Sequence, residues 1–315
     1  MNKPHVLQIG PYPQRDEELL NQHFELHRLF EIEDRDVFLE SHGADIRAIA
    51  TRGDLGASGE LIQSLPSLEI IAINGVGFDS VDLGAAKSRG IAVSNTPDVL
   101  TEDVADLAVG MMLAQSRRMV AAEHWVRSGD WKNQGDFPLT TRLHGKRAGI
   151  LGLGRIGTAV ASRLAAFKMD ICYSSTSAKK TPDSWKYIKD PVELAVNSDF
   201  LVMTLAANDQ TRHIVNKPVL DALGPQGVLI NVSRAANVDE TALLEALEKA
   251  EIAGAALDVF DGEPDINPRF LTFDNVLLQP HHSSATVETR KAMGDLMREN
   301  LLAYFAGKDL LTPVL

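Results

Sequence analysis

A glycine-rich turn lies between a strand-like and a helix-like segment near the middle of the 315-residue chain. Gly152, Gly154 and Gly157 form the pattern G-x-G-x-x-G directly after the strand-like run 147–151. In that setting the first glycine permits a tight turn, the second lets a pyrophosphate approach the backbone, and the third allows close helix–strand packing. Glycines also serve ordinary turns, so the flanking strand and helix carry the prediction. We expect a dinucleotide site at Gly152, Leu153, Gly154, Arg155, Ile156 and Gly157.

The end of the next strand-like run, 171–173, bears on which dinucleotide binds. NAD sites usually place an acid there for the ribose 2′-hydroxyl, but Asp170 lies at the beginning of this run. Hydroxyl and ammonium groups follow the run instead, and such groups bind a 2′-phosphate. A solvated polar loop would have the same composition. We predict NADP(H), contacted by Ser174, Ser175, Thr176 and Lys179.

Short buried strand-like runs alternate with helix-like stretches in two series, which start at His5 and at Arg147. This alternation is typical of parallel sheets covered on both faces, and the chain length suits two domains. Residues 101–118 resemble a long helix with Thr101 as its N-cap. We expect the following stretch, which carries Trp125 and Trp131, to be a loop.

Three loops downstream carry side chains that suit carbonyl reduction. They are residues 231–237 with Arg234, residues 257–264 with Glu263, and residues 279–286 with His281 and His282. Each loop follows a strand-like run, and ligands of α/β sheets bind at the carboxyl ends of strands. An imidazolium can protonate the oxygen that gains charge during hydride transfer, a carboxylate stabilises the imidazolium, and a guanidinium grips a substrate carboxylate. Each loop alone would equally suit a surface ion pair or a turn.

These motifs together resemble the D-isomer-specific 2-hydroxyacid dehydrogenases, and especially the NADPH-dependent glyoxylate/hydroxypyruvate reductases and related hydroxyphenylpyruvate reductases. The likeness covers nearly the whole chain. Besides the glycine turn and the three loops, it includes residues 74–82 and 95–101.

The resemblance implies a role for each catalytic side chain. Arg234 would hold the substrate, His281 would be the acid/base, and Glu263 would orient and charge the imidazole. His281 is chosen over His282 because the family histidine directly follows a proline, here Pro280.

The resemblance also implies binding residues. Backbone N–H groups at Val76 and Gly77 would receive the substrate carboxylate, in a segment that could also be a plain turn. Asp258 would face the nicotinamide amide or cap a helix, and Thr101 would reach the cofactor or act only as an N-cap. Cofactor contacts are expected at Val232 and Ser233 as well. No metal site is expected.

One departure from the family pattern concerns cofactor choice. NADPH-dependent relatives commonly carry Ser-Arg after the second strand, whereas Ser175 and Thr176 stand here. Discrimination against NADH would therefore be weaker unless Lys179 or Lys180 reaches the phosphate.

The resemblance and the alternation give a two-domain expectation. Residues 1–97 with 283–315 would form a flavodoxin-like substrate domain, and residues 98–282 a Rossmann cofactor domain, both doubly wound, with the active site in the cleft between them. The expected activity is NADPH-dependent reduction of glyoxylate or hydroxypyruvate to D-2-hydroxy acids. Alternatives are 2-ketogluconate or hydroxyphenylpyruvate reduction, or a non-catalytic dinucleotide-sensing binding protein.

Charge and composition limit the partners. Lys plus Arg total 31 against 43 Asp plus Glu, a formal net charge of −12, which disfavours binding to nucleic acid. The chain has no apolar run long enough to span a bilayer, and its single cysteine, Cys172, suits a reducing compartment. We expect a cytoplasmic protein with no membrane partner. The apolar surplus at Met111, Met112, Met119 and Val120, followed by Trp125, together with the family resemblance, predicts a homodimer.

Overall fold

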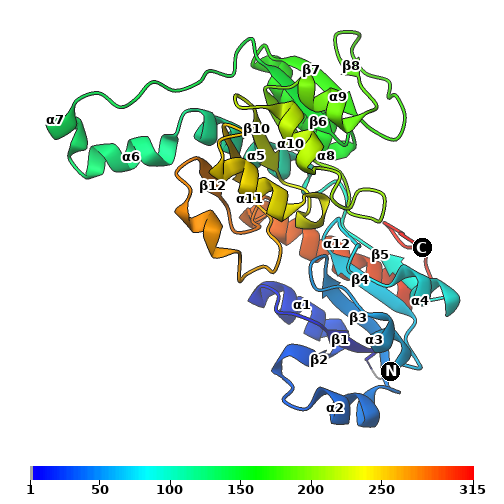
Figure 1. Ribbon diagram of the computed structural model, residues 1–315. Helices are drawn as coiled ribbons and strands as arrows, with labels where there is room; N and C mark the ends of the chain where they lie inside the picture. The colour runs from blue at the N-terminus through cyan, green and yellow to red at the C-terminus, as the bar shows by residue number, and fades with distance from the viewer. Residues whose placement is uncertain (1–2) are drawn as a thin grey trace. The chain divides into compact units, whose positions relative to one another are not determined.

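The computed structural model describes residues 3–315, which divide into two compact units (Figure 1). One comprises Met1–Leu100 with Ala285–Leu315, and the other Thr101–Ser284; the sequence placed these divisions at residues 97 and 282. Each unit contains one parallel sheet flanked by helices, so the predicted fold class is confirmed.

The first unit contains a five-stranded sheet in the order β2-β1-β3-β4-β5. This order is that of doubly wound flavodoxin-like sheets. The strands are β1 (His5–Gln8), β2 (Glu25–Arg28), β3 (Ile46–Arg52), β4 (Ile70–Asn74) and β5 (Ala92–Ser94).

Helices cover both faces of this first sheet. They are α1 (Gln14–His23), α2 (Arg35–His42), α3 (Gly59–Gln63), α4 (Leu83–Ser88) and α12 (Val287–Phe305). Successive strand residues alternate between two cores: Val6 packs in the cluster that contains Met297 of α12, and Leu7 in the one that contains Ile62 of α3. Burial on both faces explains the nearly continuous apolar runs in these strands.

The second unit contains a seven-stranded sheet in the order β12-β11-β10-β9-β6-β7-β8, with all neighbours parallel. The order reverses between β6 and β9, which is the switch point where Rossmann sheets bind ligands. The strands are β6 (Arg147–Leu151), β7 (Asp170–Ser174), β8 (Lys186–Tyr187), β9 (Phe200–Met203), β10 (Val228–Asn231), β11 (Gly254–Leu257) and β12 (Val276–Leu278).

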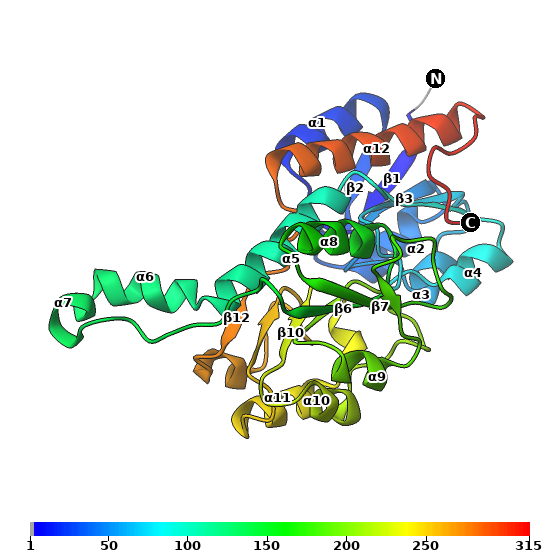
Figure 2. The same ribbon diagram turned by 90° about the horizontal axis from the view of Figure 1, so that it is seen from above.

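Helices α5 (Thr101–Ser116) and α8 (Arg155–Ala166) pack side by side on one face of this sheet (Figure 2). Arg163 of α8 joins them through ion pairs to Glu102 at 2.7 Å and Asp106 at 2.6 Å. Helix α5 begins at Thr101 itself. The opposite face carries α9 (Pro191–Val196), α10 (Lys217–Leu223) and α11 (Glu240–Glu248), seen below the sheet in Figure 2.

Residues 119–139, named the arm here, project from the second unit in both views (Figures 1 and 2). The prediction of a loop across this stretch is wrong, because α6 (Met119–Arg127) and α7 (Asp130–Gln134) lie there. Four large apolar side chains of these helices are more than half exposed, namely Met119, Val120, Val126 and Trp131. Because they face outward rather than forming a stripe against a core, hydrophobic periodicity did not reveal the helices.

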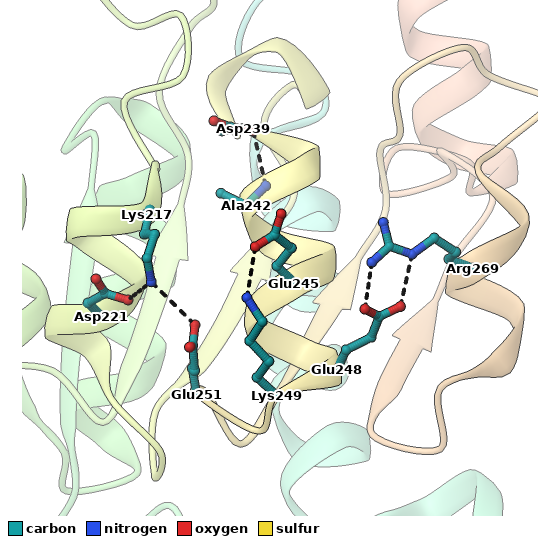
Figure 3. A network of polar contacts seen from close by, with 9 residues as sticks. All are labelled: Lys217, Asp221, Asp239, Ala242, Glu245, Glu248, Lys249, Glu251 and Arg269. Atoms are coloured by element: carbon teal, nitrogen blue, oxygen red, sulfur yellow. Dashed lines mark hydrogen bonds and ion pairs between the residues drawn. The ribbon is translucent and has the colours of Figure 1, made fainter.

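The outer surface of α10 and α11 is covered by ion pairs (Figure 3). Lys217 contacts Asp221 at 2.7 Å and Glu251 at 3.5 Å, and Lys249 contacts Glu245 at 2.9 Å. These side chains are largely exposed, and such pairs contribute only about 0–1 kcal/mol each. This surface is thus solvated and structural. No helix within residues 3–315 has the length and apolar character needed to cross a membrane.

Candidate active site

The glycine turn joins β6 to α8 and packs against the end of β9. Gly152 has a φ of 103°, and a Cβ there would lie 2.7 Å from Leu205. A Cβ at Gly157 would lie 2.2 Å from the Gly152 carbonyl oxygen and 2.7 Å from the Thr204 hydroxyl, which itself donates to that carbonyl at 2.7 Å. Both positions therefore require glycine for packing within the fold.

Gly154 has a different environment. It precedes α8 as its N-cap residue, no side chain caps the helix, and a Cβ at Gly154 would meet no protein atom within 4 Å. The first N–H groups of a helix lack intrahelical partners and favour anions. The remaining residues of the turn are buried Leu153, half-buried Ile156 and exposed Arg155. The turn therefore fits the pyrophosphate of a dinucleotide.

The loop after β7 contains the expected ribose-side residues. Ser174 is buried and its hydroxyl donates to the Lys189 carbonyl at 2.9 Å, which is a structural contact. Ser175 donates to the Ser177 carbonyl at 2.5 Å, while Thr176 and Lys179 are exposed. Asp170 lies at the opposite end of β7. Residues 174–180 contain no carboxylate, so the loop composition fits a 2′-phosphate.

Arg234 follows β10 in a turn that a buried asparagine holds. The Asn231 side chain accepts bonds from the Ser233 amide at 2.9 Å and hydroxyl at 2.8 Å, and it donates to the Arg234 carbonyl at 3.2 Å. Val232 and Ser233 are buried, and the Arg234 side chain is half-buried. No role was predicted for Asn231 from the sequence. A polar residue at the end of an apolar strand could have been used as a signal, because a buried polar side chain needs hydrogen-bond partners and finds them in the turn that follows.

Glu263 and His281 meet through a short hydrogen bond. The Glu263 Oε2 atom lies 2.6 Å from His281 Nδ1, and Oε1 accepts a bond from the Phe260 amide at 2.7 Å. The side chains are 28% and 35% exposed, so solvent and a ligand can reach the imidazole. His281 has a φ of 49°, a left-handed conformation that is uncommon outside glycine and typical of functional sites. The carboxylate fixes the ring and leaves Nε2 to face a ligand.

Asp258 holds the loop of residues 279–286, called the histidine loop here. Its carboxylate is fully buried and accepts bonds from the amides of His282 at 2.9 Å and Ser283 at 3.0 Å. The structure thus gives Asp258 a loop-fixing role that the sequence analysis did not foresee. His282 itself contacts Gln279 at 2.6 Å through its ring, which fits the loop role expected of it.

The catalytic candidates share one edge of the sheet. Strands β10, β11 and β12 are neighbours in parallel register, with Asn231 beside Leu257 and Leu257 beside Leu278. The carboxyl ends of these strands lead into the loops with Arg234, Asp258 and His281. Strand β9 separates β10 from β6, whose own carboxyl end carries the glycine turn.

In the first unit, Val76 and Gly77 follow the carboxyl end of β4. Asn95 donates to the Val76 carbonyl at 2.9 Å, and the Thr96 hydroxyl accepts from the Gly75 amide at 2.9 Å. The two residues that directly follow β5 therefore hold this loop in place. Among residues 3–315, nothing accepts a hydrogen bond from the Val76 or Gly77 amide. Those amides remain available to an anion.

Buried polar atoms without partners gather at the same edge of the first sheet. Within the described part of the chain they include the Tyr12 hydroxyl and side-chain oxygens of Gln8, Asn74 and Ser94. Gln8, Asn74 and Ser94 end β1, β4 and β5. Such atoms normally bond to water or a ligand, so this edge also fits a ligand-binding role. No cluster of three or more His, Cys, Asp or Glu in residues 3–315 is arranged to hold a metal ion.

Comparison with known proteins gives the family. Residues 109–283 match the family described as "D-isomer specific 2-hydroxyacid dehydrogenase, NAD binding domain". A glyoxylate/hydroxypyruvate reductase A of Arabidopsis thaliana is 50% identical over 310 residues, which cover 98% of each chain.

Two solved structures are similar over almost the whole chain. A 2-hydroxyacid dehydrogenase of Ketogulonicigenium vulgare Y25 is 58% identical with a TM-score of 0.94, covering 100% of this chain and 99% of that one. An NADPH-dependent glyoxylate/hydroxypyruvate reductase of Sinorhizobium meliloti, in complex with NADP and malonate, is 44% identical with a TM-score of 0.94, covering 99% and 97%.

The chain therefore belongs to the D-isomer specific 2-hydroxyacid dehydrogenases, a family of oxidoreductases that use a nicotinamide dinucleotide. The family and enzyme class predicted from the motifs are confirmed, and so is the dinucleotide class of the cofactor.

Proposed function

We propose that this protein reduces small 2-oxo acids, with glyoxylate and hydroxypyruvate as the leading substrates, to D-2-hydroxy acids with NADPH. The observation that carries the proposal is the 2.6 Å contact between Glu263 and His281 Nδ1, on the sheet edge that also carries Arg234. The relatives named as glyoxylate/hydroxypyruvate reductases support the substrate class. When bound, the cofactor would supply the hydride.

Each site residue has a distinct task in this proposal. His281 donates a proton from Nε2 to the carbonyl oxygen as negative charge develops there. Glu263 holds the ring through its contact with Nδ1, in the orientation that proton donation from Nε2 requires. The Arg234 guanidinium binds the substrate carboxylate and polarises the carbonyl, and the amides of Val76 and Gly77 receive the carboxylate as well.

The cofactor contacts are proposed from the two loops that flank β6 and β7. The glycine turn, residues 152–157, binds the pyrophosphate at the start of α8. Ser175, Thr176 and Lys179 bind the ribose 2′-phosphate, whereas Ser174 acts through its backbone. Thr101, Val232 and Ser233 are the further cofactor contacts proposed, and the buried Asp258 serves the cofactor site by fixing the histidine loop.

A direct test compares His281→Ala with His282→Ala. Loss of the proton donor should lower kcat with glyoxylate and NADPH by roughly 10²- to 10⁴-fold, the usual worth of a general acid. His282→Ala, which changes the adjacent ring, should retain most of the rate. An unchanged kcat in His281→Ala would end the assignment. Absence of turnover with every 2-oxo acid, combined with tight NADPH binding, would favour the dinucleotide-sensing alternative.

Substrate identity is tested by a panel. NADPH oxidation is measured with glyoxylate, hydroxypyruvate, 2-ketogluconate and hydroxyphenylpyruvate, and kcat/KM is compared. The proposal expects the highest values for the two small acids. A preference for either larger acid would assign the corresponding alternative reductase activity.

We also propose that the protein is a cytoplasmic homodimer. The arm exposes Met119, Val120, Val126 and Trp131, a concentration of apolar side chains that is typical of association surfaces. A second copy of this chain is the partner that the family resemblance favours. The single, buried cysteine suits the reducing cytoplasm.

A further inference from the structure

Two tyrosine hydroxyls brace the loop that follows β7. The Tyr173 hydroxyl accepts a hydrogen bond from the Lys179 amide at 3.0 Å and donates to the Lys179 carbonyl at 3.2 Å. The Tyr187 hydroxyl donates to the Ser175 carbonyl at 3.2 Å. These contacts fix the loop at its start and near its middle, because the loop runs from Ser175 to Trp185 between β7 and β8.

The two tyrosines form one unit in the sheet. Tyr173 of β7 pairs in register with Tyr187 of β8, and their ring centroids lie 5.5 Å apart. Tyr173 is 2% exposed, so its ring is part of the core while its hydroxyl serves the loop. Because a phenylalanine would fill the same core space, the hydroxyl contributes its hydrogen bonds to the loop rather than packing in the core.

The braced loop is joined to the glycine turn. The Ser174 carbonyl accepts bonds from the Gly152 amide at 2.9 Å and the Leu153 amide at 3.3 Å. The Ser175 hydroxyl donates to the Ser177 carbonyl at 2.5 Å, and the Tyr173 hydroxyl accepts a bond from the Lys179 amide. These hydrogen bonds, together with the backbone of residues 173–179 between them, relate the position of Lys179 to that of the pyrophosphate site.

The charge of this segment opposes that of the whole protein. Residues 174–189 contain four lysines, at 179, 180, 186 and 189, and one acid, Asp183, whereas the chain as a whole has a formal net charge of −12. A local positive region on an acidic protein is suited to a dianionic phosphate. The backbone of Lys179 is held at both its amide and its carbonyl by a single side chain, through the Tyr173 hydroxyl.

We propose that Tyr173 and Tyr187 are positioning residues for NADP(H) selectivity: their hydroxyls hold the β7–β8 loop so that Lys179 binds the 2′-phosphate. This inference rests on the proposed function, and it explains how the chain can select NADP(H) although Thr176 replaces the arginine of its NADPH-dependent relatives. An unbraced lysine would pay more conformational entropy on binding.

The test uses two small probes that differ only in the 2′-phosphate, 2′,5′-ADP and 5′-AMP. Their affinities for the full chain are measured by calorimetry. Tyr173→Phe should weaken binding of 2′,5′-ADP roughly 3- to 10-fold, the range of one lost hydrogen bond, and leave 5′-AMP binding unchanged. Tyr187→Phe should shift the same ratio in the same direction. Tyr304→Phe, which lies on α12 outside this unit, is the matched control.

A double-mutant cycle tests whether Tyr173 acts through Lys179. Lys179→Met should remove at least as much 2′,5′-ADP affinity as Tyr173→Phe, and the double variant should lose no more than Lys179→Met alone. In kinetics, Tyr173→Phe should raise the KM for NADPH while kcat stays unchanged.

The outcomes separate this inference from the proposed function. If the wild type binds 2′,5′-ADP no more tightly than 5′-AMP, the NADP(H) preference itself is wrong. If the wild type prefers 2′,5′-ADP but Tyr173→Phe leaves the ratio unchanged, or weakens both probes equally, the brace is structural only. Additive losses in the cycle would overturn the role of Lys179.

Discussion

At the scale of single residues, Glu263 is the centre of the proposed catalytic loop. One carboxylate oxygen holds the Phe260 amide at 2.7 Å and the other lies 2.6 Å from His281 Nδ1. The same side chain thus fixes its own loop and orients the imidazole. Asp258 fixes the histidine loop through two further amides. Two carboxylates of the loop after β11 therefore act on the histidine loop, Glu263 on the imidazole ring and Asp258 on the backbone amides.

Glu263→Gln separates charge from shape at this position. Glutamine can still bond to both partners, but it no longer places a negative charge beside the imidazole during proton transfer, so kcat with glyoxylate should fall roughly 10- to 100-fold. Steady-state kinetics measure this change. Glu240→Gln is the matched control, because Glu240 holds the Asp261 amide of the same loop at 3.1 Å and does not contact His281. Equal rate losses in both variants would mean that loop order, not charge on the imidazole, is the cause.

Part of the candidate catalytic site could be predicted from the sequence. Arg234, Glu263 and His281 were predicted because they follow strand-like runs and match family motifs, and the structure brings Glu263 and His281 into contact. The amide bonds of Asp258 and the brace of Tyr173 were missed. Both depend on which backbone groups lie opposite a side chain after folding, and no local pattern encodes that.

At the scale of elements, burial decided which predictions succeeded. Strands such as β4 and β10 are buried along their whole length and read as continuous apolar runs. The edge strands β2 and β8 were missed because β2 contains a single apolar residue, Leu26, and β8 has only two residues. The helices of the arm were missed for the opposite reason, since their apolar residues face outward.

A pH-dependent contact joins two central elements of the second sheet. Asp199, just before β9, accepts bonds from the Arg147 backbone amide at 2.8 Å and guanidinium at 3.0 Å. Burial alone would raise the pKa of this carboxyl, but the bonds from Arg147 outweigh it and hold the pKa below its ordinary value. The contact therefore contributes stability above the unfolded-state pKa of about 3.9, and that stability is lost as pH falls through the folded-state value.

Asp199→Asn should lower the free energy of unfolding at neutral pH by about 1–2 kcal/mol, the range of a hydrogen bond to a charged group at a partly exposed site. Urea denaturation measures this, and the gap between variant and wild type should narrow as pH falls below about 5. Asp170→Asn, at the exposed start of β7, should change stability little at any pH. A gap that stays constant with pH would show that ionisation of Asp199 does not stabilise the fold.

At the scale of the whole molecule, net charge opposes the association of two copies, whereas exposed apolar surface favours it. The formal net charge of −12 makes two copies repel each other, and salt screens that repulsion over about 8 Å at physiological ionic strength. The proposed dimer would therefore form mainly through apolar contact. The arm carries the exposed apolar side chains on short helices that project from the second unit (Figure 2).

Sedimentation of the wild type and of Trp131→Glu tests the dimer. Trp131 is 60% exposed on α7, and burial of a tryptophan at the centre of an interface commonly contributes 2 kcal/mol or more, so its replacement by a charge should weaken the dimer at least about 30-fold. Val37→Glu is the matched control, because Val37 is 59% exposed on α2, outside the arm. Higher salt should tighten the wild-type dimer by screening the net charge. A wild type that sediments as a monomer would contradict the proposed dimer, and equal weakening by both variants would contradict the role of the arm.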